Sequence, residues 1–437
     1  MKVSRLSGFI ATVLLSLWST GCGDTFRPVV NPFSPPLPEP AAHGLAVTVN
    51  SGGLLDGSTT CVNASAPPCP AGSVTQINVS GDTPAANPQP GGFGQTPVHA
   101  TFVPSGANTF ARAVIANKSS DNVSVYTPDS TVQANLVSLG TGAQPVFVLA
   151  TANGSKVYVA NFGNSTIGVV SPLASPPVLA ATIDNAGSQP KVMTESADGS
   201  KIYVANEDGS ISVIPTATNP ATVSVKVSSI SDTPMWIATN PAGNAVYVLY
   251  HGATDYVAIL DPGTDSFLST TVNVSTGSNY MVFDSNLQRL YVSGGSSVSV
   301  LNAATQVPSL VKNVTIPNGS VAMTVLRNGS SIYVGTGSTD GCASEADHGR
   351  AYVVNAASLA DPDATSCITV GASPVWMASS ADSLKVYVAH QGTSPGTTVI
   401  AGTTRVAEIA APFTDPNCDP ETATCFKEQP VFVMANR

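Results

Sequence analysis

The chain has 437 residues, and only 10% of them are charged, against about 25% in an average globular protein. Its formal charge is −10, and this acidic balance disfavours nucleic acid and anionic lipid surfaces as partners. Serine, threonine, asparagine and glycine supply much of the polarity, which is typical of a protein of strands and turns outside the cytosol.

The N-terminus has the features of an export signal, and residues 1–21 are predicted to be a lipoprotein-type signal peptide. Lys2 and Arg5 lie at the start of the chain, before an apolar run of 13 residues, 6–18, that is too short to span a bilayer. The run leads into the sequence STGC, which resembles a bacterial lipobox except that serine replaces the usual leucine. This resemblance implies cleavage before Cys22 and a lipid on Cys22. An ordinary secretory signal with an incidental cysteine is the alternative.

Residues 22–43 are predicted to be a tether. They contain the sequence RPVVNPFSPPLPEPAAHG, whose many prolines favour an extended, semi-rigid spacer without a core. No later apolar run is long enough to cross a bilayer, so we expect membrane contact through the N-terminal lipid only. Without Lys2 and Arg5 the formal charge of −10 becomes −12.

From Gly44 to the end of the chain, one local sequence recurs at intervals of about 44 residues. Its anchor is a tyrosine in a short apolar strand, at Tyr158, Tyr203, Tyr247, Tyr291, Tyr333 and Tyr387. Each repeat divides into four short strands, such as PVFVLA, KVYVAN, STIGVVS and VLAATI, separated by turns such as NGS and DPGT. Four strands in a repeat of this length indicate an all-β propeller in which each repeat forms one blade.

The strands VYVAN and IYVAN are each preceded by a strand that opens on proline and by a D/N-G-S turn. This pattern resembles the repeat of the YVTN family of β-propellers, and the resemblance covers residues 44–437. It implies a propeller at the bacterial surface or in the periplasm. It leaves the activity open, because related propellers include lactonases.

The two ends of the repeat region complement one another. At the N-terminal end, LAVTVN resembles the second strand of a blade, with Thr48 in the tyrosine position, but no first strand precedes it. At the C-terminal end, residues 430–435 repeat the first strand 145–150 with one substitution. We therefore expect eight blades, with the closing blade shared between the termini. Seven blades, with the N-terminal segment outside the ring, are the alternative.

The long insertions occur at equivalent places in the repeats. Residues 51–72 and 336–349 separate second from third strands, and residues 82–95 and 411–428 join consecutive blades. In an antiparallel four-stranded blade both kinds of loop leave from the same face, which we call the loop-rich face. Long loops on one face of a repeat protein usually mark its binding face.

Seven cysteines are present, and six remain when Cys22 is set aside for lipid. An even number in an exported chain suggests disulfides. The most economical pairing is Cys61–Cys69, Cys342–Cys367 and Cys418–Cys425. Cross-pairing among the first and last of these pairs stays open, because spacing alone does not select one connectivity.

The position eleven residues before the tyrosine, which we call the aromatic slot, is the first candidate site. In the eight repeats this position holds His99, Phe147, Val192, Trp236, Tyr280, Ala322, Trp376 and Phe432. His99 is placed there with four extra residues in the turn, and Phe432 by the match of residues 430–435 to 145–150. We expect the six ring-bearing residues near the start of the innermost strands, where their faces could stack on a sugar, an aromatic or a peptide ligand. The alternative is that these rings only wedge between blades.

A second candidate is the stretch that holds Asp415, Asn417, Asp419 and Glu421. Oxygen ligands at every second residue resemble the start of a calcium loop. Proline and phenylalanine stand where such a loop needs glycine and glutamate, so a solvated loop is favoured and no cofactor is expected.

The histidines are the third candidate. His251 and His390 follow second strands, and His348 lies in an insertion near Asp340, Glu345 and Asp347. Hydrolytic chemistry would need several of these groups to converge on one point, which their spacing does not show. No catalytic sequence motif is present.

The sequence therefore predicts an exported, lipid-anchored β-propeller that acts as a binding scaffold at the bacterial envelope. Its ligand would be a protein, a peptide or a glycan on the loop-rich face. A lactonase- or hydrolase-type enzyme on the same fold and a purely structural cell-surface module are the alternatives.

Overall fold

The computed structural model describes residues 44–52, 71–84, 91–106, 109–184, 187–217, 225–227, 230–337, 342, 348–412 and 428–435. They belong to a compact unit that runs from Gly44 to Arg437. All regular structure in these ranges is β-strand, in eight four-stranded antiparallel sheets. None of the described residues forms a helix of the length and apolarity that crossing a bilayer requires.

Each sheet is one blade, and we name a blade by its innermost strand. The innermost strands are β4 (Pro97–Gly106), β8 (Pro145–Ala150), β12 (Pro190–Glu195), β16 (Thr233–Thr239), β20 (Ser278–Asp284), β24 (Ala322–Val325), β28 (Pro374–Ser379) and β32 (Gln429–Ala435). The second strands are β5 (Thr109–Asn117), β9 (Val157–Asn161), β13 (Lys201–Asn206), β17 (Val246–His251), β21 (Arg289–Gly294), β25 (Ser331–Gly335), β29 (Lys385–His390) and β1 (Leu45–Ser51).

The outer half of each blade follows the same order. The third strands are β6 (Asn122–Tyr126), β10 (Thr166–Ser171), β14 (Ile211–Pro215), β18 (Tyr256–Asp261), β22 (Ser297–Asn302), β26 (His348–Asn355), β30 (Gly396–Ala401) and β2 (Ser73–Asn78). The fourth strands are β7 (Asn135–Ser138), β11 (Val178–Ile183), β15 (Val225–Val227), β19 (Ser266–Asn273), β23 (Ser309–Thr315), β27 (Cys367–Gly371), β31 (Thr404–Ala410) and β3 (Thr83–Pro84).

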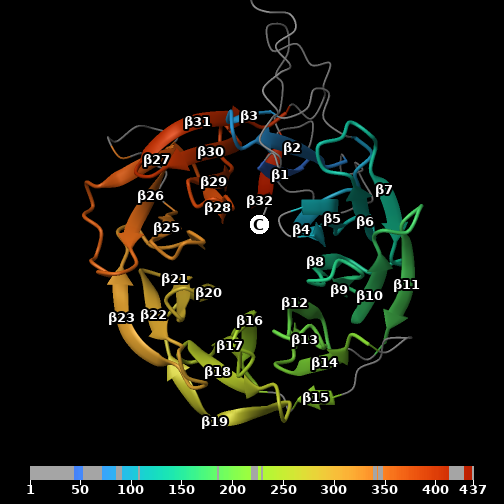
Figure 1. Cartoon of the computed structure of the whole chain (residues 1–437), viewed down its shortest axis with the longest axis horizontal. Helices are drawn as coiled ribbons and strands as arrows, with labels where there is room; N and C mark the ends of the chain where they lie inside the picture. Colours follow the sequence, from blue (N-terminus) through green and yellow to red (C-terminus); the bar gives the residue numbers. More distant parts are fainter. Residues whose placement is uncertain are drawn as a thin grey trace, which may run out of the picture. The chain divides into compact units, whose positions relative to one another are not determined.

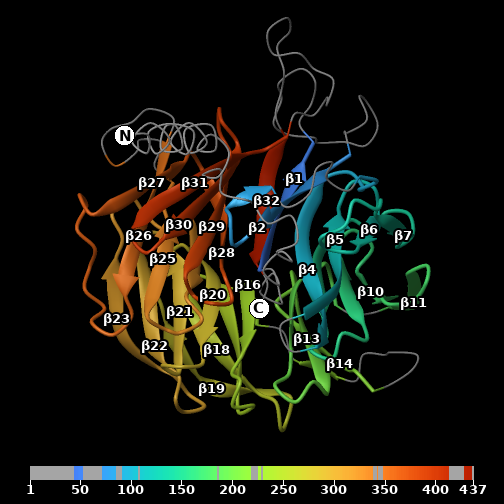
Figure 2. The same cartoon turned by 45° about the horizontal axis from the view of Figure 1, so that its top comes forward.

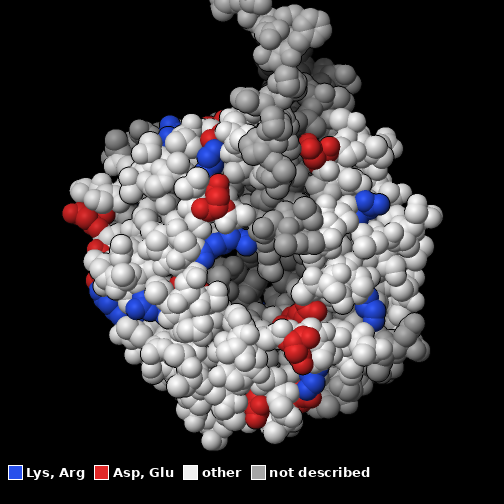
Figure 3. Space-filling model, viewed as in Figure 1, with Lys and Arg blue, Asp and Glu red and all other residues white. Residues whose placement is uncertain are grey.

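The eight blades close into a ring (Figure 1), and the face seen in Figure 3 is hollowed at its centre. Figure 1 shows the sheets following one another around a central axis, and each innermost strand contacts the innermost strands of both neighbouring blades. β32 lies between β28 and β4, so the ring closes through the C-terminal strand. The protein is thus an eight-bladed β-propeller, as the repeat predicts, and the seven-blade alternative is wrong.

The closing blade joins the two ends of the repeat region. β32 pairs antiparallel with β1, and Figure 2 shows the red C-terminal strand beside the blue N-terminal one. Phe432 lies opposite Val49, as Phe147 lies opposite Ala160 in the β8 blade. The tyrosine position of the closing blade is therefore held by Val47, and the expectation of Thr48 there is wrong by one residue. Thr48 instead hydrogen-bonds Thr397 of the β28 blade at 2.6 Å.

Burial follows the position of a strand in its blade. All five residues of β9 are buried, because a second strand has a strand on each edge and a neighbouring blade on each face. β11, a fourth strand, alternates between exposed and partly covered residues. The repeat tyrosines Tyr158, Tyr203, Tyr247, Tyr291 and Tyr387 are fully buried. The anchor of the sequence repeat is therefore a packing residue of the blades.

Cations at the starts of second strands link consecutive blades. Lys201 of the β12 blade donates to the carbonyl oxygen of Pro262 and to Asp265 in the β16 blade, each at 2.8 Å. Lys385 of the β28 blade makes the same contacts with Val79 and Asp82 of the closing blade. This second pair ties together segments from the two ends of the chain and supports the closure made by β32.

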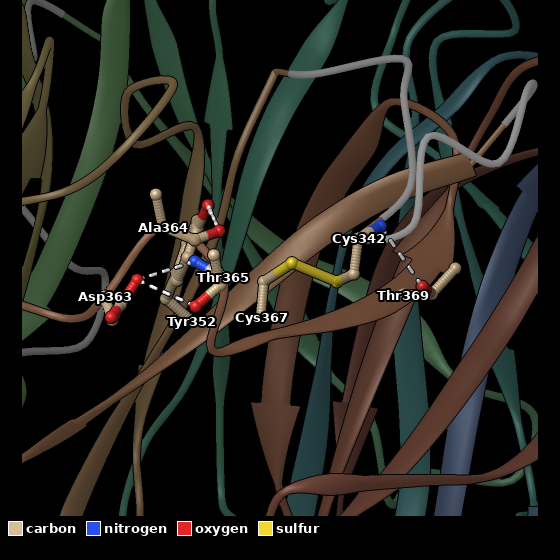
Figure 4. Close-up of a disulfide and its surroundings, with 7 residues drawn as sticks. All are labelled: Cys342, Tyr352, Asp363, Ala364, Thr365, Cys367 and Thr369. Atoms are coloured by element: carbon tan, nitrogen blue, oxygen red, sulfur yellow. Dashed lines mark hydrogen bonds between the residues drawn. A yellow bond between two sulfur atoms is a disulfide. The ribbon is translucent and has the colours of Figure 1, made fainter.

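The strand ends that flank all four insertions lie on one face, since each insertion either joins a second to a third strand or joins two blades. Most insertion residues lie outside the described ranges. Cys342 is described, and it forms the predicted disulfide with Cys367 of β27 (Figure 4). Its backbone N–H also donates to Thr369 Oγ1 at 3.3 Å. Cys22, Cys61, Cys69, Cys418 and Cys425 lie outside the described residues.

Candidate functional site: an aromatic cluster on the propeller axis

In seven of the eight blades a β-bulge positions the residue of the aromatic slot. The ladder between first and second strands shifts register just before the slot in seven of the eight blades, for example between Pro145 and Phe147 and between Pro234 and Trp236. The proline cannot donate a ladder hydrogen bond, and a bulge re-aims the side chains around it. In the β24 blade the ladder begins only at Ala322, and no bulge is formed.

The six ring-bearing residues of the slot converge, and we call them the aromatic cluster. His99 stacks on Phe147 with ring centroids 3.9 Å apart, and it lies 4.5 Å from Phe432. Trp376 lies 4.6 Å from Phe432 and 5.1 Å from Tyr280. These distances suit tilted, stacked and edge-to-face ring pairs. Phe147 and Trp376 also pack against the hydrophobic cores between blades, so packing alone stays the alternative to a binding site.

Contacts across the axis complete the cluster. Trp236 lies 4.7 Å from Tyr280 in the next blade and 5.8 Å from Trp376, with two blades between their strands. Phe147 reaches Trp236 at 5.9 Å past the β12 blade. The intervening slots hold the smaller Val192 and Ala322, which leave room for these rings. Alternation of small and large side chains is what a narrow central space requires.

His99 is the one histidine of the aromatic cluster, and its low solvent contact determines its protonation state. Burial lowers the pKa of His99 to about 3, so its imidazole is neutral at ordinary pH. Its Nδ1 accepts the N–H of Val148 at 3.4 Å. His99 therefore acts in the cluster as a flat, uncharged ring. His99 still keeps part of its surface exposed, as Trp236, Tyr280 and Trp376 do, whereas Phe147 and Phe432 are buried.

His251 lies apart from the cluster, at the loop-rich end of β17. Its Nδ1 is 2.7 Å from Oδ1 of Asp255, whose side chain is fully buried, while 55% of the His251 side chain is exposed. The other oxygen of Asp255 accepts the N–H of Ser278 at 2.7 Å. A buried carboxylate that holds one imidazole nitrogen leaves the other as a proton acceptor. The sequence analysis missed Asp255, although it stands only four residues after His251.

His390 is buried and serves packing. Its Nε2 lies 2.5 Å from Oε1 of Glu408, whose other oxygen accepts the Thr398 hydroxyl at 2.7 Å. Burial alone would raise the pKa of Glu408, but the hydrogen bond and charge of His390, with help from Thr398 and Arg405, hold it below its usual value. Gly371 of the preceding blade packs directly on the His390 ring. His390 therefore does not join His251 in one site.

Glu428, which precedes β32, is a buried acid that the sequence analysis did not single out. Its carboxylate accepts a hydrogen bond from Ser73, and Ser73 in turn accepts one from Asn50 at 3.2 Å. Burial raises the pKa of Glu428 to about 8, and the Ser73 hydrogen bond only partly opposes this shift. Nothing in the local sequence KEQPV distinguishes this glutamate from a solvated one.

His348 opens β26, opposite Gly371. Asp340, Glu345 and Asp347 lie outside the described residues, as do the proposed calcium ligands Asp415, Asn417, Asp419 and Glu421. Among the residues that the structure describes, no three His, Cys, Asp or Glu side chains are grouped to hold a metal ion.

No protein-family model and no curated protein matches the sequence. Among solved structures, the chain is similar to the dihydro-heme d1 dehydrogenase NirN (TM-score 0.61, 12% identity, 89% of this chain and 74% of that one). It is also similar to a 6-phosphogluconolactonase-like protein of Bacteroides fragilis (0.55, 12%, 91% and 99%). Hydrazine synthase of Kuenenia stuttgartiensis is a third (0.54, 15%, 70% and 96%). At these identities the likeness concerns the propeller fold alone.

Proposed function

We propose that the protein is an exported, lipid-anchored β-propeller of the YVTN type that acts as a binding scaffold at the bacterial envelope. Its ligand, a protein, a peptide or a glycan, would bind on the loop-rich face over the aromatic cluster. No catalytic residue and no cofactor belong to this proposal.

The aromatic cluster is the observation that carries the proposal. Six rings from six blades meet at the axis, and Trp236, Tyr280 and Trp376 keep part of their surface exposed. Rings that only filled the core would be expected to lose this exposure, because the free energy gained by burial grows with the apolar area removed from water. Partly exposed, preorganised aromatic faces are what a stacking site for a ligand needs.

The export part of the proposal rests on the signal-like residues 1–21, the STGC sequence and the proline-rich residues 22–43. Its test is Cys22→Ser, followed by separation of membrane and soluble fractions. An acyl chain stabilises membrane binding by about 0.8 kcal/mol for each buried CH₂ group, so the variant should move to the soluble fraction. Unchanged membrane retention would contradict lipid anchoring.

The binding part is tested by a thermal-shift screen of the full chain with peptides and glycans, with lactones and Ca²⁺ in parallel. A ligand that binds only the folded state raises the melting midpoint. Each compound that does so is then measured on Trp376→Ala and on Val406→Ala. Val406 is an exposed residue of β31 in the same blade and serves as the matched control. Loss of the shift in the tryptophan variant alone supports the site.

A lactonase- or hydrolase-type enzyme is the second candidate, and the pair of His251 and Asp255 favours it. An exposed imidazole oriented by a buried carboxylate is the arrangement that a general base uses. The fold is also that of the 6-phosphogluconolactonase-like protein of Bacteroides fragilis. Lactone hydrolysis by the wild type that is lost in both His251→Gln and Asp255→Asn would favour the enzyme over the scaffold.

A further inference from the structure

The residue between the opening position and the aromatic slot keeps part of its side chain exposed in every blade. The opening position of a blade is the residue two before the aromatic slot, and its side chain is buried in all eight blades. The eight residues are Pro97, Pro145, Pro190, Pro234, Ser278, Ser320, Pro374 and Pro430. The next residue is never buried, and these eight residues form what we call the collar. They are Val98, Val146, Lys191, Met235, Asn279, Val321, Val375 and Val431.

The collar lies at the loop-rich mouth of the axis. An innermost strand has a second strand on one edge and a neighbouring blade on each face, so its side chains reach solvent only at the axis or at the strand end. The collar residue comes one position before the aromatic slot, on the loop-rich side. In the bulged blades it is the extra residue of the bulge, as Val146 and Val375 are. The collar therefore surrounds the entrance above the aromatic cluster.

The chemistry of the collar is mostly aliphatic and uncharged. Six of its eight residues are valine or methionine, and 41% of Val321 is exposed. The other five aliphatic members are partly exposed and pack against the cores between blades. Lys191 is the single charged member, and its ammonium group forms an ion pair with the carboxylate of Glu207 at 2.8 Å. A partly exposed apolar lining with few polar groups is typical of small-molecule sites. Beneath the collar, the aromatic cluster contributes flat ring faces to the same site, among them the uncharged imidazole of His99.

We infer that the site takes an uncharged small molecule with a flat, apolar body, which enters end-on and rests on the aromatic cluster. This inference rests on the site of the proposed function and replaces its ligand class, a protein, a peptide or a glycan, by an apolar small molecule. The rings that meet across the axis form the floor of the site, on which the ligand comes to rest. An extended peptide would bring a backbone N–H and C=O for each residue against aliphatic side chains that cannot pair with them.

The test uses two probes with one anilinonaphthalene skeleton, neutral N-phenyl-1-naphthylamine and its sulfonated analogue 8-anilino-1-naphthalenesulfonate. In the full chain carrying Trp18→Phe, the two remaining tryptophans, Trp236 and Trp376, both lie in the cluster. Probe emission sensitised by tryptophan therefore reports binding beside them. We expect the neutral probe to bind at least tenfold more tightly than the sulfonate.

A charge placed on the collar should reverse this preference. Val375→Lys is expected to weaken the neutral probe at least tenfold and to strengthen the sulfonate, and Val146→Lys on another blade should repeat the result. Val406→Lys, at a residue that is 48% exposed on the outermost strand of the Val375 blade, is the matched control and should change neither affinity. Melting curves of each variant confirm that it is folded.

Three results would overturn the inference: no sensitised emission with the neutral probe, equal affinities for the two probes, or equal effects of Val375→Lys and Val406→Lys. Failure of the proposed function looks different. If the neutral probe does not bind but Trp376→Ala still removes the thermal shift of a screened peptide or glycan, the ligand class is wrong and the site stands. If Trp376→Ala changes the binding of no compound, the site itself is rejected.

Discussion

Trp236 and Trp376 belong to blades that are separated by two others, and their ring centroids are nonetheless only 5.8 Å apart. A propeller blade otherwise contacts mainly its two neighbours, so this pair connects parts of the ring that the blade-to-blade packing does not. The small side chain of Ala322 between them makes the contact geometrically feasible. The cluster is therefore both a stabilising centre of the ring and the floor of the proposed binding site.

Truncation after Gln429 should destabilise the whole propeller. It removes the rest of β32 and exposes the edge of β1, whose hydrogen bonds contribute about 0.5–1.5 kcal/mol each. It also removes buried Phe432, Val433 and Met434, at roughly 1.5–3 kcal/mol for each large side chain. These losses approach the stability of a typical domain, about 5–15 kcal/mol. We expect a much lower melting midpoint or aggregation. A truncated chain that stays monomeric and melts within about two degrees of the full chain would contradict this closure.

The low pKa of His99 predicts a specific dependence of stability on pH. The folded state resists protonation down to about pH 3, whereas an unfolded histidine takes up a proton near 6.5. The stability that the neutral ring contributes is thus fully present above pH 6.5 and is lost as the pH falls toward 3. Urea denaturation at pH 7 and pH 4.5 should show a smaller loss for His99→Phe than for the wild type. An identical loss in both would mean that His99 is already charged when folded.

Glu428 should make the free energy of unfolding depend on pH in the opposite direction. Its pKa is about 8 when folded and 4.5 in the reference state, so its contribution is present below pH 4.5 and is lost as the pH rises to 8. Glu428→Gln should therefore gain stability relative to the wild type between pH 5 and pH 8, by at most about 1.4 kcal/mol for each pH unit. Urea midpoints at these two values measure the effect. A difference between the two proteins that does not change with pH would show that Glu428 is ionised in the folded state.

Gly371 is a position where any side chain should destabilise the fold. A Cβ atom there would lie 1.9 Å from Nδ1 of the buried His390, which is fixed by Glu408. Gly371→Ala should cost about 1–3 kcal/mol, the usual range for overpacking. Gly91→Ala is the control, because its Cβ would meet no atom within 4 Å. Equal melting midpoints for the two variants would rule out the predicted clash.

The fold followed from the sequence because its signals are local and repeated. Each tyrosine and each proline-opened strand marks the same place in a blade, and the match of residues 430–435 to 145–150 locates the closing strand. The tyrosine position of the closing blade was assigned to Thr48 instead of Val47 because LAVTVN lacks the tyrosine that identifies this position in the other blades. The disulfide between Cys342 and Cys367 was one of several allowed pairings.

The candidate site was predictable only in part. The repeat places the members of the aromatic slot at equivalent positions, but contacts such as that of Trp236 with Trp376 depend on how eight blades curve around an axis. The bulge that positions these rings follows a proline in most blades, but the one before Tyr280 follows Ser278 and has no such mark in the sequence. Asp255, the partner of His251, lies in a loop between strands, and Glu428 lies directly before β32. Solvated and buried acids look alike in sequence at such positions.

Binding measured together with melting on Trp236→Ala and Trp376→Ala tests the central claim most directly. Compounds that raise the melting midpoint of the wild type are titrated into each variant, and the affinity is expressed per folded molecule. We predict that both variants remain folded and that binding is lost. Their free energies of unfolding should fall by no more than the roughly 3–5 kcal/mol typical of Trp→Ala changes in a core. Large losses of stability with unchanged affinity per folded molecule would show that the cluster is packing alone and would contradict the account.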